Sequence, residues 1–154
     1  MKLRKGFTLV ELLIVIVIIG ILAAAMLLSS GSATAAAEAS NIVSDLRSMK
    51  AAALMFYADS MDSLPGLSTL RLTHLQPYMD NPAKFTQSNG YIFGGTSSPY
   101  SWWVGFDLTT GKKSAEVAKK LAARAKSVGV YNKMSNATTD EFKGTDTKAY
   151  MIAR

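Results

Sequence analysis

The feature that most constrains this chain is an apolar run close to its N-terminus. Residues 7–28 contain a single charged side chain, Glu11, and they follow a short basic stretch at residues 1–6. At about 1.5 Å per residue, a helix over this run is about 33 Å long, enough to cross a hydrocarbon core of about 30 Å. We therefore expect one membrane-spanning helix, with the basic stretch on the cytoplasmic side.

Composition limits what the rest of the chain can be. A length of 154 residues leaves room for one domain beside the apolar helix. The absence of cysteine excludes disulfides, thiolate nucleophiles, zinc–thiolate sites and iron–sulfur ligation. Half of the net charge of +6 comes from residues 1–6, so the remainder is weakly basic. That balance is unlike the dense basic patches of dedicated nucleic-acid-binding proteins.

Glu11 is the anomaly within the apolar run. A carboxylate inside a membrane-spanning helix is expensive unless it is neutralised or paired. No Lys, Arg or His lies in residues 7–28, so we expect its partner to be a chain terminus or another molecule. A cut between Gly6 and Phe7 would create an α-amino group four residues before Glu11. On a neighbouring copy of the chain, that amine is a chemically reasonable partner.

The stretch from Lys5 to Leu13, KGFTLVELL, resembles the class III prepilin signal of type IV pilins and type II secretion pseudopilins. The resemblance implies that a prepilin peptidase cleaves after Gly6 and that the new N-terminal residue, Phe7, is N-methylated. It also implies that Glu11 acts in filament assembly by contacting the N-terminus of a neighbouring subunit. The resemblance covers only about residues 1–30, so it says little about the rest of the chain.

Two other interpretations of the N-terminal segment remain open. An ordinary secretory signal, cleaved after Ala33-Thr34-Ala35, would release a soluble domain that starts near Ala36. A plain membrane anchor would explain the length of the apolar run. Neither explains Glu11. The chain also lacks the proline that many pilins carry near the end of this segment, so Gly20 and the small residues at 29–32 are its weak points.

The helix is predicted to continue beyond the membrane. Apolar residues spaced by three and four indicate an amphipathic helix to about Asp59, with Pro65-Gly66 beyond its end. The residues of this stripe are Ile42, Leu46, Met49, Ala53 and Phe56. We therefore divide the chain into a leader (1–6), a transmembrane or filament-core helix (7–28), an amphipathic continuation (29–60) and a globular head (61–154).

The head is predicted to contain a small antiparallel β-sheet. Tyr91-Ile92-Phe93 is typical of a strand, which we expect Gly94-Gly95 to end. The alternation in residues 100–107 predicts a second strand, and residues 148–152 a last one. Tyr100, Trp102, Val104 and Phe106 share the face expected to pack on the helix. Trp103 faces the other way, where either the next helix or a subunit or ligand contact covers it.

A second amphipathic helix is predicted after Ser114. Its outer side carries Lys119, Lys120 and Arg124, which form either a solvated face or a candidate polyanion-binding face. Residues 129–144 are predicted to form a surface loop that includes the triplet Asn136-Ala137-Thr138, which fits a glycosylation sequon. No calcium-loop spacing joins the acidic residues of this region, so we expect no metal. The lone histidine, His74, receives no role.

The expected fold is α+β and type IV pilin-like: a long N-terminal hydrophobic helix packed on a small antiparallel sheet, with an additional helix in the C-terminal half. No G-x-S-x-G motif and no phosphate-cradling loop is present, so we expect neither an enzyme nor a cofactor.

The predicted function is that of a structural subunit, a pilin, of a type IV pilus filament. The alternatives are a pseudopilin of a type II secretion system, or a minor pilin that binds DNA. The expected partners are copies of itself in a helical homopolymer, the prepilin peptidase, the inner-membrane assembly platform, and the membrane before assembly. Nucleic acid is a partner only in the minor-pilin alternative. The precursor is expected in the inner membrane and the assembled filament at the cell surface.

Overall fold

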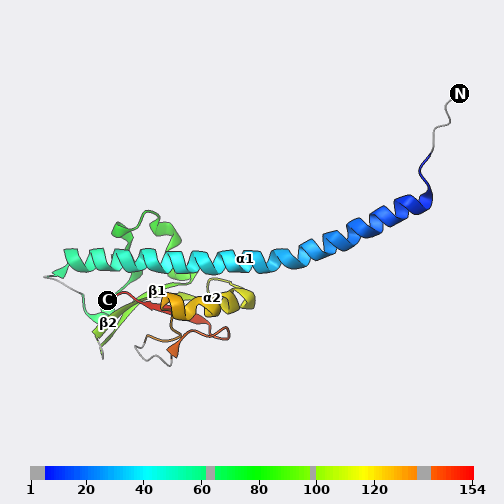
Figure 1. Ribbon diagram of the computed structural model, residues 1–154. Coiled ribbons are helices and arrows are strands. Elements are labelled where there is room, and N and C mark those ends of the chain that lie inside the picture. The colour runs from blue at the N-terminus through cyan, green and yellow to red at the C-terminus, as the bar shows by residue number, and fades with distance from the viewer. Residues whose placement is uncertain (1–5, 62–64, 98–99, 135–139) are drawn as a thin grey trace. The chain divides into compact units, whose positions relative to one another are not determined.

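A computed structural model describes residues 6–61, 65–97, 100–134 and 140–154 of the chain (Figure 1). The leader residues 1–5 and the sequon at Asn136 lie outside the described residues. The chain divides into two compact units, of which the first ends at Thr34 and the second is Ala35–Arg154. One helix, α1 (Leu9–Asp59), contributes to both units.

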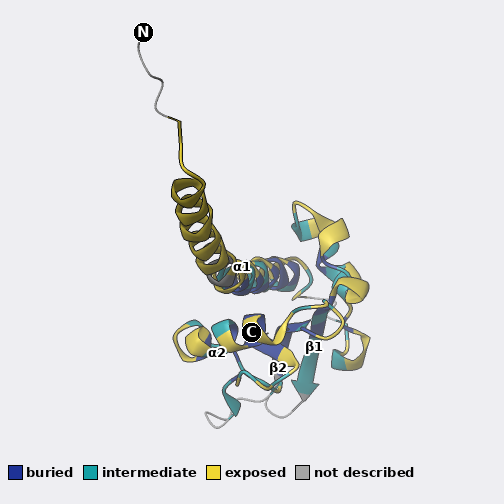
Figure 2. Cartoon of the chain, turned by 90° about the vertical axis from the view of Figure 1, so that its right-hand side faces the viewer, coloured by how far each residue is buried: buried dark blue, intermediate teal, exposed yellow. Residues whose placement is uncertain are grey.

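In the first unit, the described side chains of α1 are exposed. Its large apolar side chains up to Leu27 are exposed, and Figure 2 shows this segment as exposed throughout. Phe7 is 85% exposed and Leu27 78%. Helix α1 is long and apolar enough to cross a membrane. An apolar surface of this extent is unstable in water, so the segment requires lipid or other apolar helices around it.

In the second unit, one stripe of α1 is buried. The predicted stripe is confirmed, because Ile42, Leu46, Met49, Ala53 and Phe56 all belong to the hydrophobic core. The side of the helix that faces the sheet is buried and the opposite side is exposed (Figure 2). The spacing by three and four therefore fixes which side of the helix carries the head.

Three antiparallel strands form the sheet, in the order β1 (Tyr91–Ser97), β2 (Tyr100–Asp107), β3 (Lys148–Ile152). Strand β2 is central, and Val104 pairs with Phe93 of β1 and with Met151 of β3. The described side chains of its inner face lie in the core with α1, and the Trp102 ring stacks on Phe56 with centroids 5.7 Å apart. The side chain of Tyr100 lies outside the described part of the chain.

Gly94-Gly95 do not end β1, so this detail of the sequence prediction is wrong. The strand continues to Ser97, and Gly95 pairs with Trp102. A Cβ atom at Gly95 would lie 2.6 Å from a methyl carbon of Leu67 and 3.1 Å from the Ser101 carbonyl oxygen. The glycine is therefore needed for close packing against the strand and not for a turn.

The outer face of β2 is buried as well. Trp103 has no exposed surface, its ring meets the Tyr131 ring edge-on at 6.0 Å, and its Nε1 donates to Thr96 Oγ1 at 3.3 Å. Tyr131 is held in turn by backbone hydrogen bonds to Tyr150 of β3. The interpretation of Trp103 as a subunit or ligand contact is wrong, because the chain segment that follows the second long helix covers it.

That second helix, α2 (Ala115–Val128), matches the predicted amphipathic element. Ser114 precedes its first turn, and Gly129 ends it in the left-handed conformation at a φ of 71°. Its buried face is Val117, Ala118, Leu121 and Ala125. Between α1 and β1 the chain forms short 3-10 turns at Leu67–Thr69, Leu72–His74, Gln76–Tyr78, Pro82–Lys84 and Gln87–Asn89.

Hydrogen bonds and ion pairs, which we call ties, join α1 to the head at several points along the helix. Glu38 pairs with Lys113 at 3.1 Å, and Arg124 Nη1 donates to Ser40 Oγ at 2.5 Å. Further along, Arg154 Nη2 donates to the Tyr57 hydroxyl at 2.8 Å, and its guanidinium lies 3.6 Å above the Tyr57 ring centroid.

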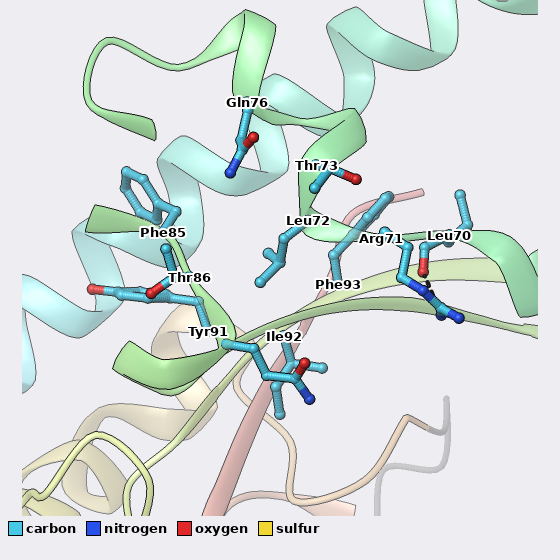
Figure 3. Close-up of a pocket in the computed structure, with 11 residues that line it drawn as sticks. Leu70, Arg71, Leu72, Thr73, Gln76, Phe85, Thr86, Tyr91, Ile92 and Phe93 are labelled. Atoms are coloured by element: carbon cyan, nitrogen blue, oxygen red, sulfur yellow. Dashed lines mark hydrogen bonds between the residues drawn. The ribbon is translucent and has the colours of Figure 1, made fainter. Parts of the chain in front are cut away.

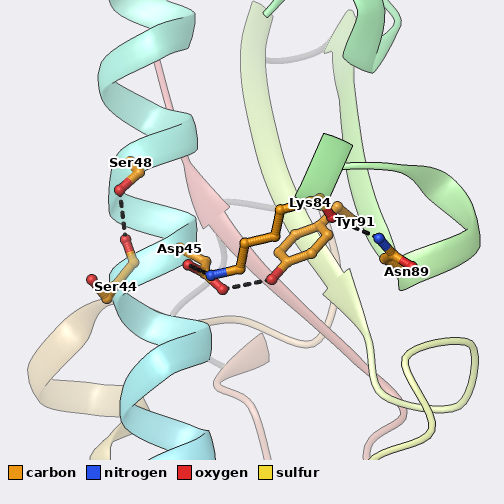
Figure 4. Close-up of polar contacts among 6 residues, drawn as sticks. All are labelled: Ser44, Asp45, Ser48, Lys84, Asn89 and Tyr91. Carbon is orange, nitrogen blue, oxygen red and sulfur yellow. Dashed lines mark hydrogen bonds and ion pairs between the residues drawn. The ribbon is translucent and has the colours of Figure 1, made fainter. Parts of the chain in front are cut away.

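The most buried tie centres on Asp45, whose side chain is 13% exposed. Its carboxylate accepts from Lys84 Nζ at 2.6 Å and from the Tyr91 hydroxyl at 2.5 Å (Figure 4). Burial, together with the hydrogen bond to Asp45, raises the pKa of Tyr91 well above its usual range. The folded head therefore holds Tyr91 as a neutral phenol.

This raised pKa predicts a loss of stability at alkaline pH. Above about pH 10 the unfolded chain releases the Tyr91 proton whereas the folded head keeps it, so stability falls by up to about 1.4 kcal/mol per pH unit for this group. We expect Tyr91→Phe to have a shallower decline than the parent chain between pH 9 and 11 in urea unfolding followed by tryptophan fluorescence. An unchanged slope would contradict the assignment.

The turn after β2 offers a packing test. A Cβ atom at Gly111 would overlap the Phe106 ring, so Gly111→Ala should lower the free energy of unfolding by about 1–3 kcal/mol. Gly66→Ala is the matched control, because among the described residues its Cβ would come within 4 Å of Thr69 Oγ1 alone, at 3.8 Å. We expect that control to stay within about 0.5 kcal/mol of the parent chain in urea unfolding. Equal effects of the two substitutions would contradict the packing argument.

Candidate functional site: the N-terminal assembly segment

The first turn of α1 is closed by two side chains of the predicted site region. Thr8 precedes the first helical residue, and its Oγ1 accepts a hydrogen bond from the Glu11 backbone N–H at 3.2 Å. Glu11 Oε2 accepts from the Thr8 N–H at 2.8 Å and from the Thr8 hydroxyl at 2.7 Å. This reciprocal arrangement is a capping box.

The capping box changes the environment of the Glu11 carboxylate. It satisfies two of the backbone N–H groups that a helix N-terminus leaves without partners, and it places a negative charge at the positive end of the helix dipole. Both contacts to the carboxylate use Oε2. A carboxylate has more acceptor sites than these two contacts use, so a further donor can still bind it.

Sequence reasoning missed Thr8 because it looked only for a charged partner of Glu11. The signal was present, since Thr8 and Glu11 have the T-x-x-E spacing that typifies a capping box directly before an apolar run. The carboxylate thus has a partner within its own chain in addition to the terminus expected from a neighbouring copy.

The predicted cleavage point lies just outside the helix. Gly6 and Phe7 are both exposed and precede the first helical residue, Leu9. Among the described residues, nothing lies within 4 Å of a Cβ atom built at Gly6. The bond between Gly6 and Phe7 therefore lies in exposed chain outside the helix, which begins at Leu9.

Comparison with known proteins identifies this segment. The family model of the prokaryotic N-terminal methylation motif matches residues 1–27. The chain carries a prokaryotic N-terminal methylation motif. The motif fits the type IV pilin and pseudopilin family, and it indicates a pilin-like or pseudopilin precursor that enters the membrane and is processed by a prepilin peptidase. That family is structural and not typically enzymatic.

No curated protein and no solved structure matches the chain. The methylation motif leaves residues 28–154 unmatched. The motif therefore gives no information about the head.

The structure only partly supports a free cationic face on α2. Lys119 Nζ lies 2.8 Å from Glu116 Oε1, and this contact lowers the pKa of the Glu116 carboxyl. Arg124 donates to Ser40 of α1, as described above. Lys120 is half-buried. Two of the three predicted polyanion-binding residues thus have partners in their own chain.

A groove of about 650 Å³ runs beside β1, between the 3-10 turns that precede the strand (Figure 3). Its wall combines the apolar side chains of Leu72 and Ile92 with the amides of Gln76 and Gln87. The residues that line it include no carboxylate. Within the described part of the chain, no group of three or more His, Cys, Asp or Glu could hold a metal ion.

The capping box predicts a measurable fraying of the first helical turn when it is broken. Thr8→Val keeps the volume of the side chain but removes the hydroxyl, so the Glu11 amide loses its acceptor. Because such a cap is worth about 1 kcal/mol, we expect hydrogen exchange at the Glu11 amide to become roughly fivefold faster in detergent micelles. Thr8→Ser retains the hydroxyl and should behave as the parent chain. Equal protection in the Val and parent chains would refute the cap.

Proposed function

We propose that this chain is the structural subunit, or pilin, of a type IV pilus filament, and that it is processed after Gly6 and assembled through its N-terminal helix. The observation that carries the proposal is the first unit itself: an uncovered apolar helix whose N-terminus is closed by Glu11 and preceded by an accessible Gly6-Phe7 bond. The methylation motif over residues 1–27 supports this function.

Processing supplies the group that assembly needs. Cleavage between Gly6 and Phe7 by the prepilin peptidase removes the basic leader and creates an α-amino group, which is then methylated. A methylated amine remains a cation that can donate a hydrogen bond. It therefore complements a carboxylate, and the Glu11 carboxylate of a neighbouring copy is its expected acceptor.

Assembly exchanges lipid for protein around the apolar helix. The precursor waits in the inner membrane, and the assembly platform lifts subunits so that their helices pack together as the core of a homopolymer. The apolar side chains give attraction but little register, because many axial positions bury them equally. Glu11 sets the register, since a slipped position leaves a buried carboxylate without a cationic partner. The finished filament stands at the cell surface.

A type II secretion pseudopilin shares the same motif and the same assembly chemistry. A pseudopilin differs in that it builds a short fibre in the periplasm. The chain's abundance in filaments sheared from cells separates the two, because a pilin dominates that material and a pseudopilin does not.

The deciding experiment is the yield of sheared filaments and the mass of their N-terminal peptide. The parent chain should give abundant filaments whose subunits begin with methylated Phe7. Glu11→Ala should still be inserted, cleaved and methylated, but its filament yield should fall by about tenfold or more. Glu38→Ala is the matched control on the same helix: it removes a half-exposed carboxylate paired with Lys113, and because such a pair contributes about 1 kcal/mol or less, this variant should assemble normally.

Normal filament yield from Glu11→Ala would refute the register argument. A mature N-terminus near Ala36 would mean an ordinary secreted domain, and the pilin function would fall with it.

A further inference from the structure

One pocket of the head takes no part in the proposed filament assembly. A pocket of about 350 Å³ lies where the turn after β2 meets the segment that leads into β1. Three lysines line it, Lys84, Lys112 and Lys113, together with the polar side chains of Ser88, Asn89 and Thr110. We call it the lysine pocket. The residues that line it include no carboxylate.

Two glycines bring the walls of the lysine pocket together. Gly90 adopts a φ of 92°, and a Cβ atom there would lie 2.6 Å from the Asp107 carbonyl oxygen and 2.9 Å from the Gly111 nitrogen. The Asp107 N–H donates to the Gly90 carbonyl at 2.7 Å. Gly90 and Gly111 both lack side chains, so the backbone at Gly90 can approach the backbone of the turn at Gly111 closely. Lysines that are far apart in the sequence thereby reach one pocket.

Lys112 is held in an unusual conformation. Its φ of 54° is the one positive value at a non-glycine position in the described residues. Such a conformation is strained for most L-residues, and glycine or asparagine would adopt it more readily. Strained residues of this kind gather at functional sites. A lysine in this position suggests that its ammonium group is used.

The charges of the lysine pocket are only partly balanced. Lys84 pairs with Asp45 at 2.6 Å and Lys113 with Glu38 at 3.1 Å, both carboxylates belonging to α1. Each ammonium has three donors, so a single carboxylate leaves others for a ligand. No ion pair joins Lys112 to a carboxylate in the part of the chain that the structure describes.

We propose that the lysine pocket binds a phosphate or sulfate group. A tetrahedral oxyanion accepts hydrogen bonds from ammonium, hydroxyl and amide donors, and the pocket supplies all three kinds. A concave site that holds one such group differs from the stripe of cations that a nucleic-acid backbone needs. Lys119 and Arg124 on α2 also have partners within the chain, so the lysine pocket differs from that face in its concave wall and in Lys112, which has no ion pair among the described residues.

The test is a titration of the unassembled full chain in a nonionic detergent. Sodium phosphate and sodium sulfate are added at constant ionic strength, and the backbone amide shifts of Thr110 and Lys112 are followed by NMR. We expect saturable shifts that chloride does not produce. A sulfated oligosaccharide and inorganic phosphate are compared as separate arms, and tighter binding of the oligosaccharide identifies a polymer-borne group as the natural source.

Lys112→Gly is the informative variant. Glycine accepts the left-handed backbone, so the head stays folded, but the ammonium is lost. We expect phosphate affinity to fall roughly tenfold, because the ligand loses a charge-assisted hydrogen bond. Lys120→Gln, on α2, is the matched control and should bind as the parent chain does. Circular dichroism checks that both variants keep the fold.

Three results would overturn the proposal: no saturable shift below about 10 mM ligand, unchanged affinity in Lys112→Gly, or an equal loss in Lys120→Gln. Binding of duplex DNA that depends on Lys119, Lys120 and Arg124 would transfer anion recognition to α2. The titration uses unassembled protein, so its outcome is independent of whether the chain forms filaments.

Discussion

The exposed apolar surface of the first part of α1 is the main constraint on this chain, because exposing it to water costs free energy. Every large side chain of α1 up to Leu27 is exposed in the isolated subunit. A chain with such a segment is stable only in lipid or among other apolar helices, and in the proposed filament the Glu11 carboxylate would limit which arrangements of the helices are possible. In the isolated subunit, Thr8 donates two hydrogen bonds to the Glu11 carboxylate. The free-energy cost of placing that carboxylate in an apolar environment is therefore lower even without a neighbouring copy. The same atoms can therefore serve a waiting state and an assembled one.

The head depends on the other half of the same helix. Its core forms because the buried stripe of α1 meets the inner face of β2, and β2 is also covered on its outer face through Trp103 and Tyr131. The central strand thus has packing on both sides although the sheet has only three strands. This small head is stabilised by packing without disulfides, which small secreted domains often need for stability.

The sequence predicted those elements whose signal is local. The spacing by three and four located the buried stripe of α1, alternation located β2, and the bounds of β3 were as expected. The misses in the head involve contacts between distant segments. Gly94-Gly95 looked like a strand end because sequence alone does not show Leu67 lying over Gly95. The Asp45–Tyr91 tie and the lysine pocket were missed for the same reason. At the N-terminus, Thr8 was missed although its spacing from Glu11 was visible, because the search considered only charges.

The ties between α1 and the head also have a mechanical consequence. Glu38, Ser40, Asp45 and Tyr57 follow one another along the helix, and each is bound by a different segment of the head. Any one tie of this kind contributes about 1 kcal/mol or less when exposed. A force that pulls along the helix axis meets all of them in parallel, together with the interlocked side chains of the stripe. Sliding the head along α1 therefore requires all of these contacts to break together, a resistance that would suit the tension transmitted by the proposed filament.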